Sequence, residues 1–245
     1  MPNIAILIIS STDSNSITSN YHNNRWITEK LAWKNHYITK PKNIDIFFLE
    51  CNKDIDKTIS IDDTLVNKCS DSSIWPFSPS LYQKTVDSIE YLIKKDKYDY
   101  FVRTNLSTFI CFDNLNKFIE KYTPTYSGIL CNYPSWVNGW GIILNKNIAN
   151  ILVIKGGKHT PIYNLNKPDD VCIGKVLFNN NIKCELDINH KDKNIAYLWK
   201  FNKSIPYNLS ILEKYNNKVF IRLNMHNYFN KNVFLNICNI LETIT

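Results

Sequence analysis

The sequence predicts an α/β fold with a mostly parallel central sheet flanked by helices. The first run, Ile4–Ile9, is apolar throughout rather than alternating, which is typical of a strand buried on both faces. Strand-like and helix-like segments then alternate over residues 4–180, as they do in parallel α/β sheets. Hydrophobic residues make up 44% of the 245 residues and charged residues 21%, enough for a sizeable core. No linker or internal repeat divides the chain, so we expect a single domain over residues 1–245.

The first elements follow from local patterns. A polar loop over residues 10–20 leads to a helix-like segment at 25–35, where apolar residues recur at helical spacing. Ile44–Leu49 is expected to be the second strand. Residues 51–80 are polar and irregular and end in Trp75-Pro-Phe-Ser-Pro79, and this proline spacing favours a loop.

The middle of the chain contains the most informative segment. A helix is expected from about Leu81 to Lys95, followed by a third strand at Tyr98–Val102 that is aromatic and apolar. This strand ends abruptly in a mostly polar run at residues 103–108. Such a change indicates a buried strand whose carboxyl end opens into a ligand crevice. Asp113 is expected to be the N-cap of a short helix after it.

Further strands and helices are expected in the later part of the chain. Gly156-Gly157 should end one of these helices. We predict strands at Ser127–Cys131, Gly141–Leu144 and Val219–Leu223, and helices from Asn145 or Lys146 to Ile154, from Pro168 to Phe178, and from Asn230 to Thr243.

Charge and glycine content narrow the classes of function. The net charge is +7, and a basic surface can attract nucleic acid, a membrane or an anionic nucleotide. The densest clusters, at 94–97 and 191–193, are diluted by aspartates. We therefore expect a solvated surface and no nucleic-acid partner. Only six glycines are present, so a glycine-rich phosphate loop is not expected.

The seven cysteines include no Cys-x-x-Cys pair. Cys111, Cys131 and Cys172 stand in apolar runs, so we expect small buried hydrophobic residues rather than a disulfide framework or a zinc site. A reducing compartment fits this usage. Ile4–Ile9 is too short to span a bilayer and lacks a basic leader. We predict no membrane span and a cytoplasmic location, which would be the host cytoplasm for a viral protein.

Five segments, in order, carry a resemblance to a known family. They span about residues 4–180, and the last is the most specific. The segments are a helix with Arg25, Lys30 and Trp33, then Leu81-Tyr-Gln-Lys-Thr85, Phe101-Val-Arg-Thr-Asn-Leu-Ser-Thr-Phe109, Asn138-Gly-Trp-Gly-Ile-Ile-Leu-Asn145 and Pro168-Asp-Asp-Val-Cys-Ile-Gly174. Together they resemble the fringe and β-1,3-galactosyltransferase family of inverting glycosyltransferases. The resemblance implies one GT-A-like (Rossmann-like) domain, with a nucleotide-sugar-binding half at 1–125 and an acceptor-binding half at 126–245.

The resemblance also implies which residues hold the donor, a nucleoside diphosphate sugar in which UDP is the expected carrier. Backbone groups near the first strand would contact the nucleoside, and cations would neutralise the phosphates. Most lysines and arginines on helices are merely solvated, and this is the alternative interpretation for Arg25 and Lys84. The candidate donor-binding residues are Ser10, Ser11, Asp13, Arg25, Lys84, Arg103, Thr104, Asn105 and Ser107.

The chain departs from the family at the metal motif. The family places carboxylates where this chain has Asn105, Leu106 and Ser107, and hard cations need oxygen ligands that are usually anionic. We expect no tightly bound metal, and whether Mn²⁺ or Mg²⁺ takes part stays open. Either Arg103 replaces the ion, or catalysis is lost and the fold only binds. Without the carboxylates, His190 is expected to be a surface residue rather than a metal ligand.

Asp170 is the catalytic candidate. An inverting transferase needs a carboxylate to take the proton of the acceptor hydroxyl, and the resemblance assigns this to Asp170 with Asp169 in support. Both could instead stabilise the start of a helix. The acceptor-side motif implies contacts from aromatic and small residues, although the tryptophans could equally belong to the core. These acceptor-binding candidates are Trp136, Asn138, Gly139 and Trp140.

The predicted function is inverting transfer of a hexose or N-acetylhexosamine to the hydroxyl of a glycan or protein acceptor, without a metal. The alternative is a catalytically inactive glycan- or nucleotide-binding module on the same fold. The composition, with the resemblance, fits a microbe or a large DNA virus.

Overall fold

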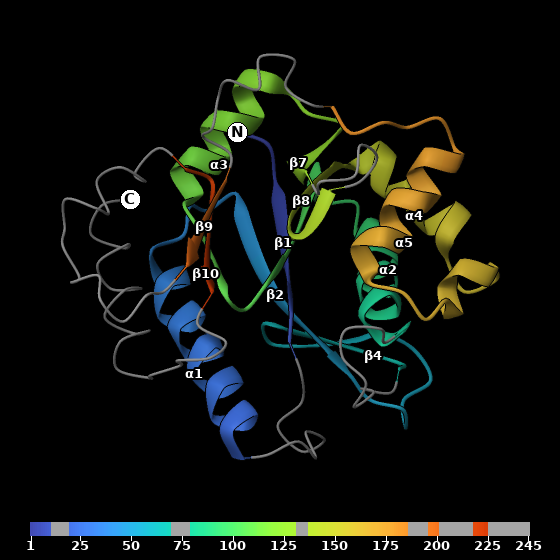
Figure 1. The fold of residues 1–245 in the computed structure, drawn as a ribbon, viewed down its shortest axis with the longest axis horizontal. Helices are drawn as coiled ribbons and strands as arrows, with labels where there is room; N and C mark the ends of the chain where they lie inside the picture. Colours follow the sequence, from blue (N-terminus) through green and yellow to red (C-terminus); the bar gives the residue numbers. More distant parts are fainter. Residues whose placement is uncertain (11–19, 70–78, 131–136, 186–195, 201–217, 225–245) are drawn as a thin grey trace.

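A computed structural model describes residues 1–10, 20–69, 79–130, 137–185, 196–200 and 218–224. Its centre is a seven-stranded sheet in the order β3-β4-β2-β1-β5-β8-β7, and Figure 1 shows helices on both of its faces. The strands of this sheet are β1 (Ile4–Ile9), β2 (Ile44–Cys51), β3 (Ile59–Ile61), β4 (Thr64–Asn67), β5 (Tyr100–Asn105), β7 (Tyr126–Leu130) and β8 (Val137–Asn145).

The helices lie in two layers. The longer ones are α1 (Asn20–His36), α2 (Pro79–Ile93), α3 (Phe112–Tyr122), α4 (Lys146–Gly156) and α5 (Asp169–Asn179), and two short 3₁₀ turns are η1 (Tyr37–Thr39) and η2 (Pro161–Asn164). In Figure 1, α1 and α3 lie on one side of the sheet, and α2, α4 and α5 lie on the other. This arrangement confirms the predicted α/β class with a helix-flanked sheet.

Strand direction confirms the rest of the class prediction. The four neighbours β4, β2, β1 and β5 run parallel, whereas β3 and β8 are antiparallel to the strands beside them. Strand β7 pairs antiparallel with β8 and so runs in the direction of β5. The sheet is therefore mostly parallel.

The central position of β1 in the fold explains why its sequence is apolar throughout. Ile4–Ile8 are fully buried because helices cover both faces of β1. Ile4, Ile6 and Ile8 pack in the core that includes Trp33 of α1, whereas Ala5 and Leu7 pack in the core beneath α2. A strand that alternates between two apolar layers needs no polar face.

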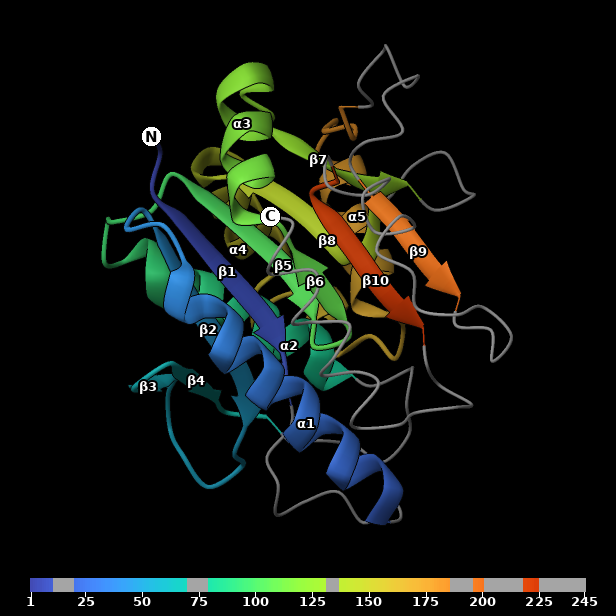
Figure 2. The ribbon, with the colours of Figure 1, turned by 90° about the vertical axis from the view of Figure 1, so that its left-hand side faces the viewer.

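A second, three-stranded sheet lies beside the first, in the order β6-β10-β9 (Figure 2). It contains β6 (Thr108–Ile110), β9 (Ala196–Lys200) and β10 (Phe220–Asn224). The late strand predicted at Val219–Leu223 is thus confirmed, shifted by one residue. The closing helix predicted at 230–243 lies outside the described residues.

Two local predictions were wrong. Residues 51–80 are not irregular throughout, because β3 and β4 form there and β4 extends the parallel sheet beside β2. Both strands are too short to give a clear alternating pattern. Asp113 is not an N-cap: Cys111 occupies that position with an extended backbone, and Asp113 lies in the first turn of α3.

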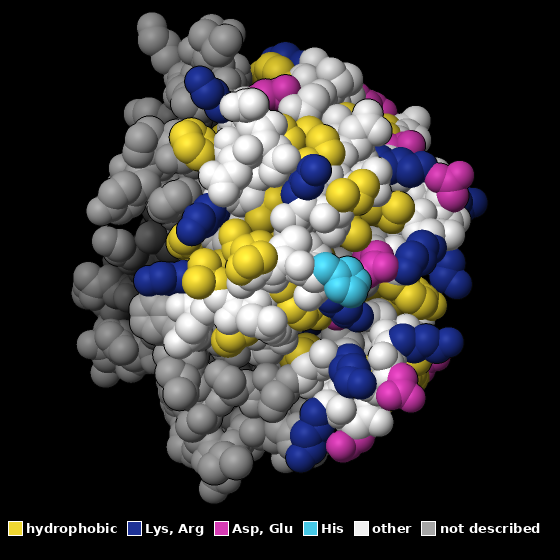
Figure 3. All heavy atoms as spheres, turned by 90° about the vertical axis from the view of Figure 1, so that its right-hand side faces the viewer, with side chains coloured by type: hydrophobic (Ala, Val, Ile, Leu, Met, Phe, Trp, Pro, Cys, Tyr) yellow, Lys and Arg dark blue, Asp and Glu magenta, His cyan; other side chains and the backbone are white. Residues whose placement is uncertain are grey.

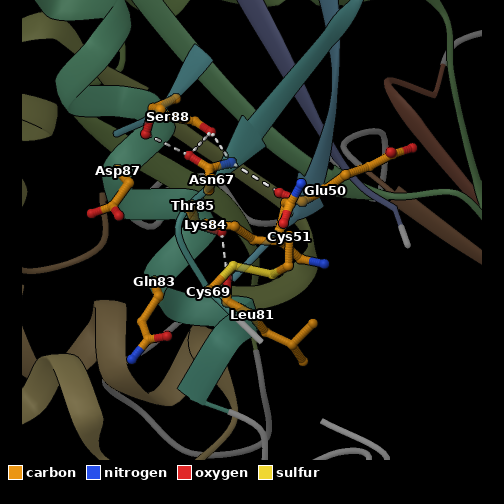
Figure 4. The surroundings of a disulfide bond; sticks show 12 residues. Glu50, Cys51, Asn67, Cys69, Leu81, Gln83, Lys84, Thr85, Asp87 and Ser88 are labelled. Atoms are coloured by element: carbon orange, nitrogen blue, oxygen red, sulfur yellow. Dashed lines mark hydrogen bonds between the residues drawn. A yellow bond between two sulfur atoms is a disulfide. The ribbon is translucent and has the colours of Figure 1, made fainter. Parts of the chain in front are cut away.

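The cysteine prediction was also wrong in part. Cys51, at the end of β2, and Cys69, shortly after β4, form a disulfide (Figure 4). Disulfides persist mainly in oxidising environments, so this bond counts against the expected reducing compartment. Cys111 and Cys172 are buried and free, as expected, and Cys131 lies outside the described residues. Among the helices that the structure describes, none is both long and apolar enough to cross a membrane.

Basic residues are dispersed over one face of the molecule. On the face shown in Figure 3, which includes α4 and α5, lysine and arginine side chains alternate with acidic and apolar ones. This pattern agrees with a solvated surface on that face rather than with a continuous basic stripe.

Candidate functional site

The strand order places a topological switch point at β1. From β1 the chain moves outward to β2 and β4, then returns through α2 to β5 on the other side of β1. Open α/β sheets bind ligands in the crevice outside the carboxyl ends of the strands at such a point. The carboxyl ends of β1 and β5 are directly paired, with Ile9 opposite Asn105. The polar run found in the sequence therefore lies at the expected edge.

One group of polar residues surrounds the carboxyl end of β1, and we call it the β1-end cluster: Ser10, Lys30, Glu50 and Lys84. The Lys84 ammonium, from α2, donates to the backbone carbonyl oxygen of Ser10 at 2.5 Å. Glu50, in β2, accepts from Lys30 at 2.6 Å and from the Ser10 hydroxyl at 3.5 Å. These contacts hold two cations and one carboxylate beside the switch point.

Two charged members of this cluster, Lys84 and Glu50, are buried. Lys84 is only 1% exposed and Glu50 is 9% exposed, and Figure 4 shows both beside the Cys51–Cys69 disulfide. Neither Glu50 nor its pairing with Lys30 was predicted from the sequence. The available signal was the position of Glu50 near the end of the second strand, where dinucleotide-binding folds place an acidic residue on the ribose.

A second group joins three elements, and we call it the Asp170 cluster: Arg103, Gly139, Asp169 and Asp170. Arg103 is in β5, and its Nη2 atom lies 2.5 Å from a carboxylate oxygen of Asp169, which is at the start of α5. The next residue, Asp170, accepts a hydrogen bond from the Gly139 backbone N–H of β8 at 3.0 Å. Its other oxygen accepts from the Val171 N–H at 2.8 Å.

The two aspartates have different surroundings. Asp169 is 4% exposed, and burial raises the pKa of its carboxyl, which the Arg103 guanidinium opposes and the neighbouring Asp170 reinforces. Asp170 is half-buried and reaches the surface. The buried aspartate is thus matched by a cation, and Asp170 is the member of the pair that a ligand can approach.

Local sequence explains why these groups meet. Pro168 occupies the N-cap of α5 without any side-chain hydrogen bond, so the two aspartates supply the negative charge that a helix N-terminus favours. Gly139 is required by space: a Cβ atom there would lie 2.7 Å from Arg103 Nη1 and 3.4 Å from the Asp170 Cβ. The glycine therefore lets both side chains approach the backbone of β8.

Other predicted residues occupy structural positions close by. Thr104 is fully buried and its hydroxyl donates to the Trp140 carbonyl oxygen at 3.0 Å, which ties β5 to β8. Trp140 is 6% exposed and Ser107 is 8% exposed, whereas Asn105 and Asn138 are half-buried. Several predicted positions lie outside the described residues, namely Ser11, Asp13, Trp136, His190 and the side chain of Arg25.

The residues at the metal-motif position do not fit a divalent cation. Asn105 and Ser107 offer only neutral oxygens, Leu106 is apolar, and the Leu106 carbonyl oxygen accepts from the Trp33 indole at 3.0 Å. Across the described ranges, no group of three or more His, Cys, Asp or Glu side chains is arranged to hold a metal.

Comparisons with known proteins give little sequence similarity. No protein-family model matches the chain, and no curated protein matches it. One solved structure to which the chain is similar is described as a glycosyltransferase involved in the glycosylation of the major capsid of PBCV-1. The identity is 10% and the TM-score 0.45, over 98% of this chain and 100% of that one. A similarity of this size does not identify a function.

Proposed function

We propose that the protein is an inverting glycosyltransferase of GT-A-like fold, similar to the fringe and β-1,3-galactosyltransferase family. It would transfer a hexose or N-acetylhexosamine from a nucleoside diphosphate sugar, with UDP as the expected carrier, to a hydroxyl of a glycan or protein. The observation that carries the proposal is the Asp170 carboxylate, which is half-buried and oriented by the Gly139 N–H. Around it lie the residues of the Asp-Asp-Val-x-x-Gly motif and the carboxyl end of β5.

The proposed step uses Asp170 as general base. The acceptor oxygen attacks the anomeric carbon and its proton moves to the Asp170 carboxylate. The bond from that carbon to the diphosphate oxygen breaks at the same time, with its electron pair, so the configuration inverts. The nucleoside diphosphate then leaves, and Asp170 later releases its proton to water. Asp169 stays paired with Arg103 and takes no proton.

The leaving diphosphate needs positive charge, which in this proposal comes from protein cations rather than a metal. Arg103 is committed to Asp169 at 2.5 Å, so Arg25 is the proposed phosphate partner. Lys84 is 1% exposed and donates to the Ser10 carbonyl oxygen, so its proposed role is to hold the end of β1 in place beside the donor. Ser10, at the end of β1, and Glu50, at the end of β2, stand where the nucleoside would bind. The acceptor side is proposed to include Trp136 and Asn138.

A second candidate is a binding module without turnover. Both Asp170 oxygens accept backbone N–H groups, as they would in a residue that only stabilises the start of a helix. Such a module would hold a nucleotide or glycan at the same edge of the sheet. The two candidates differ in whether bound donor is consumed.

The test combines binding and turnover. Thermal shifts are measured with UDP, GDP and their hexose and N-acetylhexosamine conjugates, with EDTA or with manganese, because ligands of the folded state raise the melting temperature. Release of free nucleoside diphosphate is then followed for the wild type and for Asp170→Asn. Asp113→Asn is the matched control, since Asp113 lies in the first turn of α3 and is exposed.

We expect one nucleotide to stabilise the protein in EDTA. We also expect Asp170→Asn to keep that binding while losing turnover by about 100-fold or more, and Asp113→Asn to turn over normally. Undiminished turnover in Asp170→Asn would overturn the base assignment. Binding without turnover in the wild type would establish the module instead.

A further inference from the structure

We infer that Arg103 and Asp169 are a positioning pair, which acts through the start of α5 to hold the Asp170 carboxylate in its reactive orientation. This inference rests on the proposed function and deepens it. It assigns Arg103 a different task from the phosphate contact that the family resemblance implies. Three sets of observations carry it.

The first is geometric closure around one carboxylate. Arg103 of β5 pairs with Asp169, whose neighbour Asp170 is bonded to the Gly139 N–H of β8. Arg103 Nη1 in turn lies so near Gly139 that a Cβ there would come within 2.7 Å of it. Each of the three elements is therefore tied to the other two. Because Asp169 and Asp170 are consecutive, a shift of the Arg103 guanidinium moves the backbone that carries Asp170.

The second set of observations indicates that this ion pair contributes little to stability. Arg103 is 3% exposed, and its Nε and Nη1 atoms have no hydrogen-bond partner among the described residues. Buried donors left unsatisfied are destabilising, and replacing a buried ion pair with apolar residues is often neutral or stabilising. A pair kept only for stability would not leave two guanidinium nitrogens unused. A role in orienting the neighbouring Asp170 carboxylate explains why a pair that is unfavourable for stability is present.

The third is access. The same two nitrogens are enclosed by protein, and the remaining nitrogen, Nη2, contacts Asp169. A diphosphate could reach Nε and Nη1 only after the cluster opened, and it could reach Nη2 only in competition with Asp169. Arg103 therefore acts through Asp169 and not on the donor.

The test replaces both members with apolar residues, as Arg103→Met/Asp169→Leu. We expect a melting temperature equal to or above that of the wild type. We also expect kcat to fall about 100-fold, as for a catalytic group displaced by about 1 Å, with KM for the donor changed less than about twofold. The control is Glu90→Gln/Lys94→Met, which removes an exposed ion pair at the carboxyl end of α2 and should leave every readout unchanged.

Other outcomes overturn the inference. If melting temperature and kcat fall together, the pair is structural. If KM rises while kcat holds, Arg103 contacts the donor. The milder Arg103→Lys keeps the charge without the planar fork, and it should fold even if the double variant does not. We expect it to lower kcat about tenfold, and full activity there would contradict the inference.

A readout independent of turnover separates this inference from the proposed function. The Gly139 amide proton, bonded to a carboxylate, should resonate downfield because charge-assisted hydrogen bonds are short and strong. We expect Asp170→Asn to shift it upfield, and both Arg103→Met/Asp169→Leu and Arg103→Lys to do so in part. If no donor is turned over but these shifts occur, only the proposed function fails. If neither Arg103 variant moves the resonance, positioning fails even in an active enzyme.

Discussion

The Cys51–Cys69 disulfide allows one prediction to be worked out in numbers. The two cysteines are separated by 18 residues in the sequence, and the loop they close contains both β3 and β4. A crosslink stabilises mainly by restricting the unfolded chain, and for a loop of this length that restriction amounts to about 11 cal/mol/K, or about 3 kcal/mol at 25 °C. For a chain of this size, losing it should lower the melting temperature by about 6–12 °C.

The assay is thermal and urea unfolding with and without dithiothreitol, for the wild type and for Cys51→Ala/Cys69→Ala. Both cysteines are buried, so the substitutions also remove packing, and the comparison that isolates the crosslink is reductant against no reductant. We expect the wild type to lose about 3 kcal/mol on reduction and the double variant to be insensitive to it.

Three results would refute this reasoning. Intact mass with thiol labelling first establishes whether the bond is present in the purified protein, and two labelled thiols at Cys51 and Cys69 would remove the premise. If the bond is present and its reduction leaves the unfolding free energy unchanged, the restriction of the unfolded chain is not what it contributes. Reduction that also unfolds the double variant would show that the reductant acts elsewhere.

Two further predictions concern buried groups near the sheet. Burial lowers the pKa of His36 from 6.5 to about 4, so below pH 6.5 the unfolded state binds a proton that the folded state does not. Stability should therefore be full above pH 6.5 and fall by up to about 3 kcal/mol as the pH drops toward 4; urea unfolding at several pH values should show this slope, and an equally steep slope in His36→Phe would contradict it. Gly139→Ala should cost about 1–3 kcal/mol through overpacking against Arg103, measured by urea unfolding, and a variant as stable as the wild type would show that the guanidinium moves freely.

Several features were predictable because they depend on neighbours in sequence. The unbroken apolar run Ile4–Ile9 predicted a strand covered on both faces, and the structure confirms it with helices on each side. A helix was predicted to start at Asn145 or Lys146, and the Asn145 side chain accepts the Ile148 N–H at 2.9 Å as an N-cap does. The paired aspartates at 169 and 170 were placed at a helix start, where they are found.

Other features depend on contacts that the sequence does not reveal. Strand β4 is short and is stabilised by its pairing with β2, so its own residues carry a weak signal. The polar residues Arg103, Thr104 and Asn105 continue β5 instead of ending it. Their partners there, Asp169 and the Trp140 carbonyl, lie far along the chain. Asp113 resembled a cap, but backbone geometry gave that position to Cys111.

The sequence alone determined the class of the fold and the helix start at Asp169 and Asp170, and the family resemblance implies the chemistry proposed for these two residues. Hydrophobic periodicity and helix-start chemistry depend on residues that are close together in the chain, so they can be recognised in the amino-acid sequence. Only the tertiary structure decided which group Arg103 contacts, since a guanidinium at the end of a strand could face a phosphate or a carboxylate. Burial, the approach allowed by Gly139 and the start of α5 brought Asp169 to it. An ion pair between residues so far apart in sequence is fixed by packing and not by local pattern.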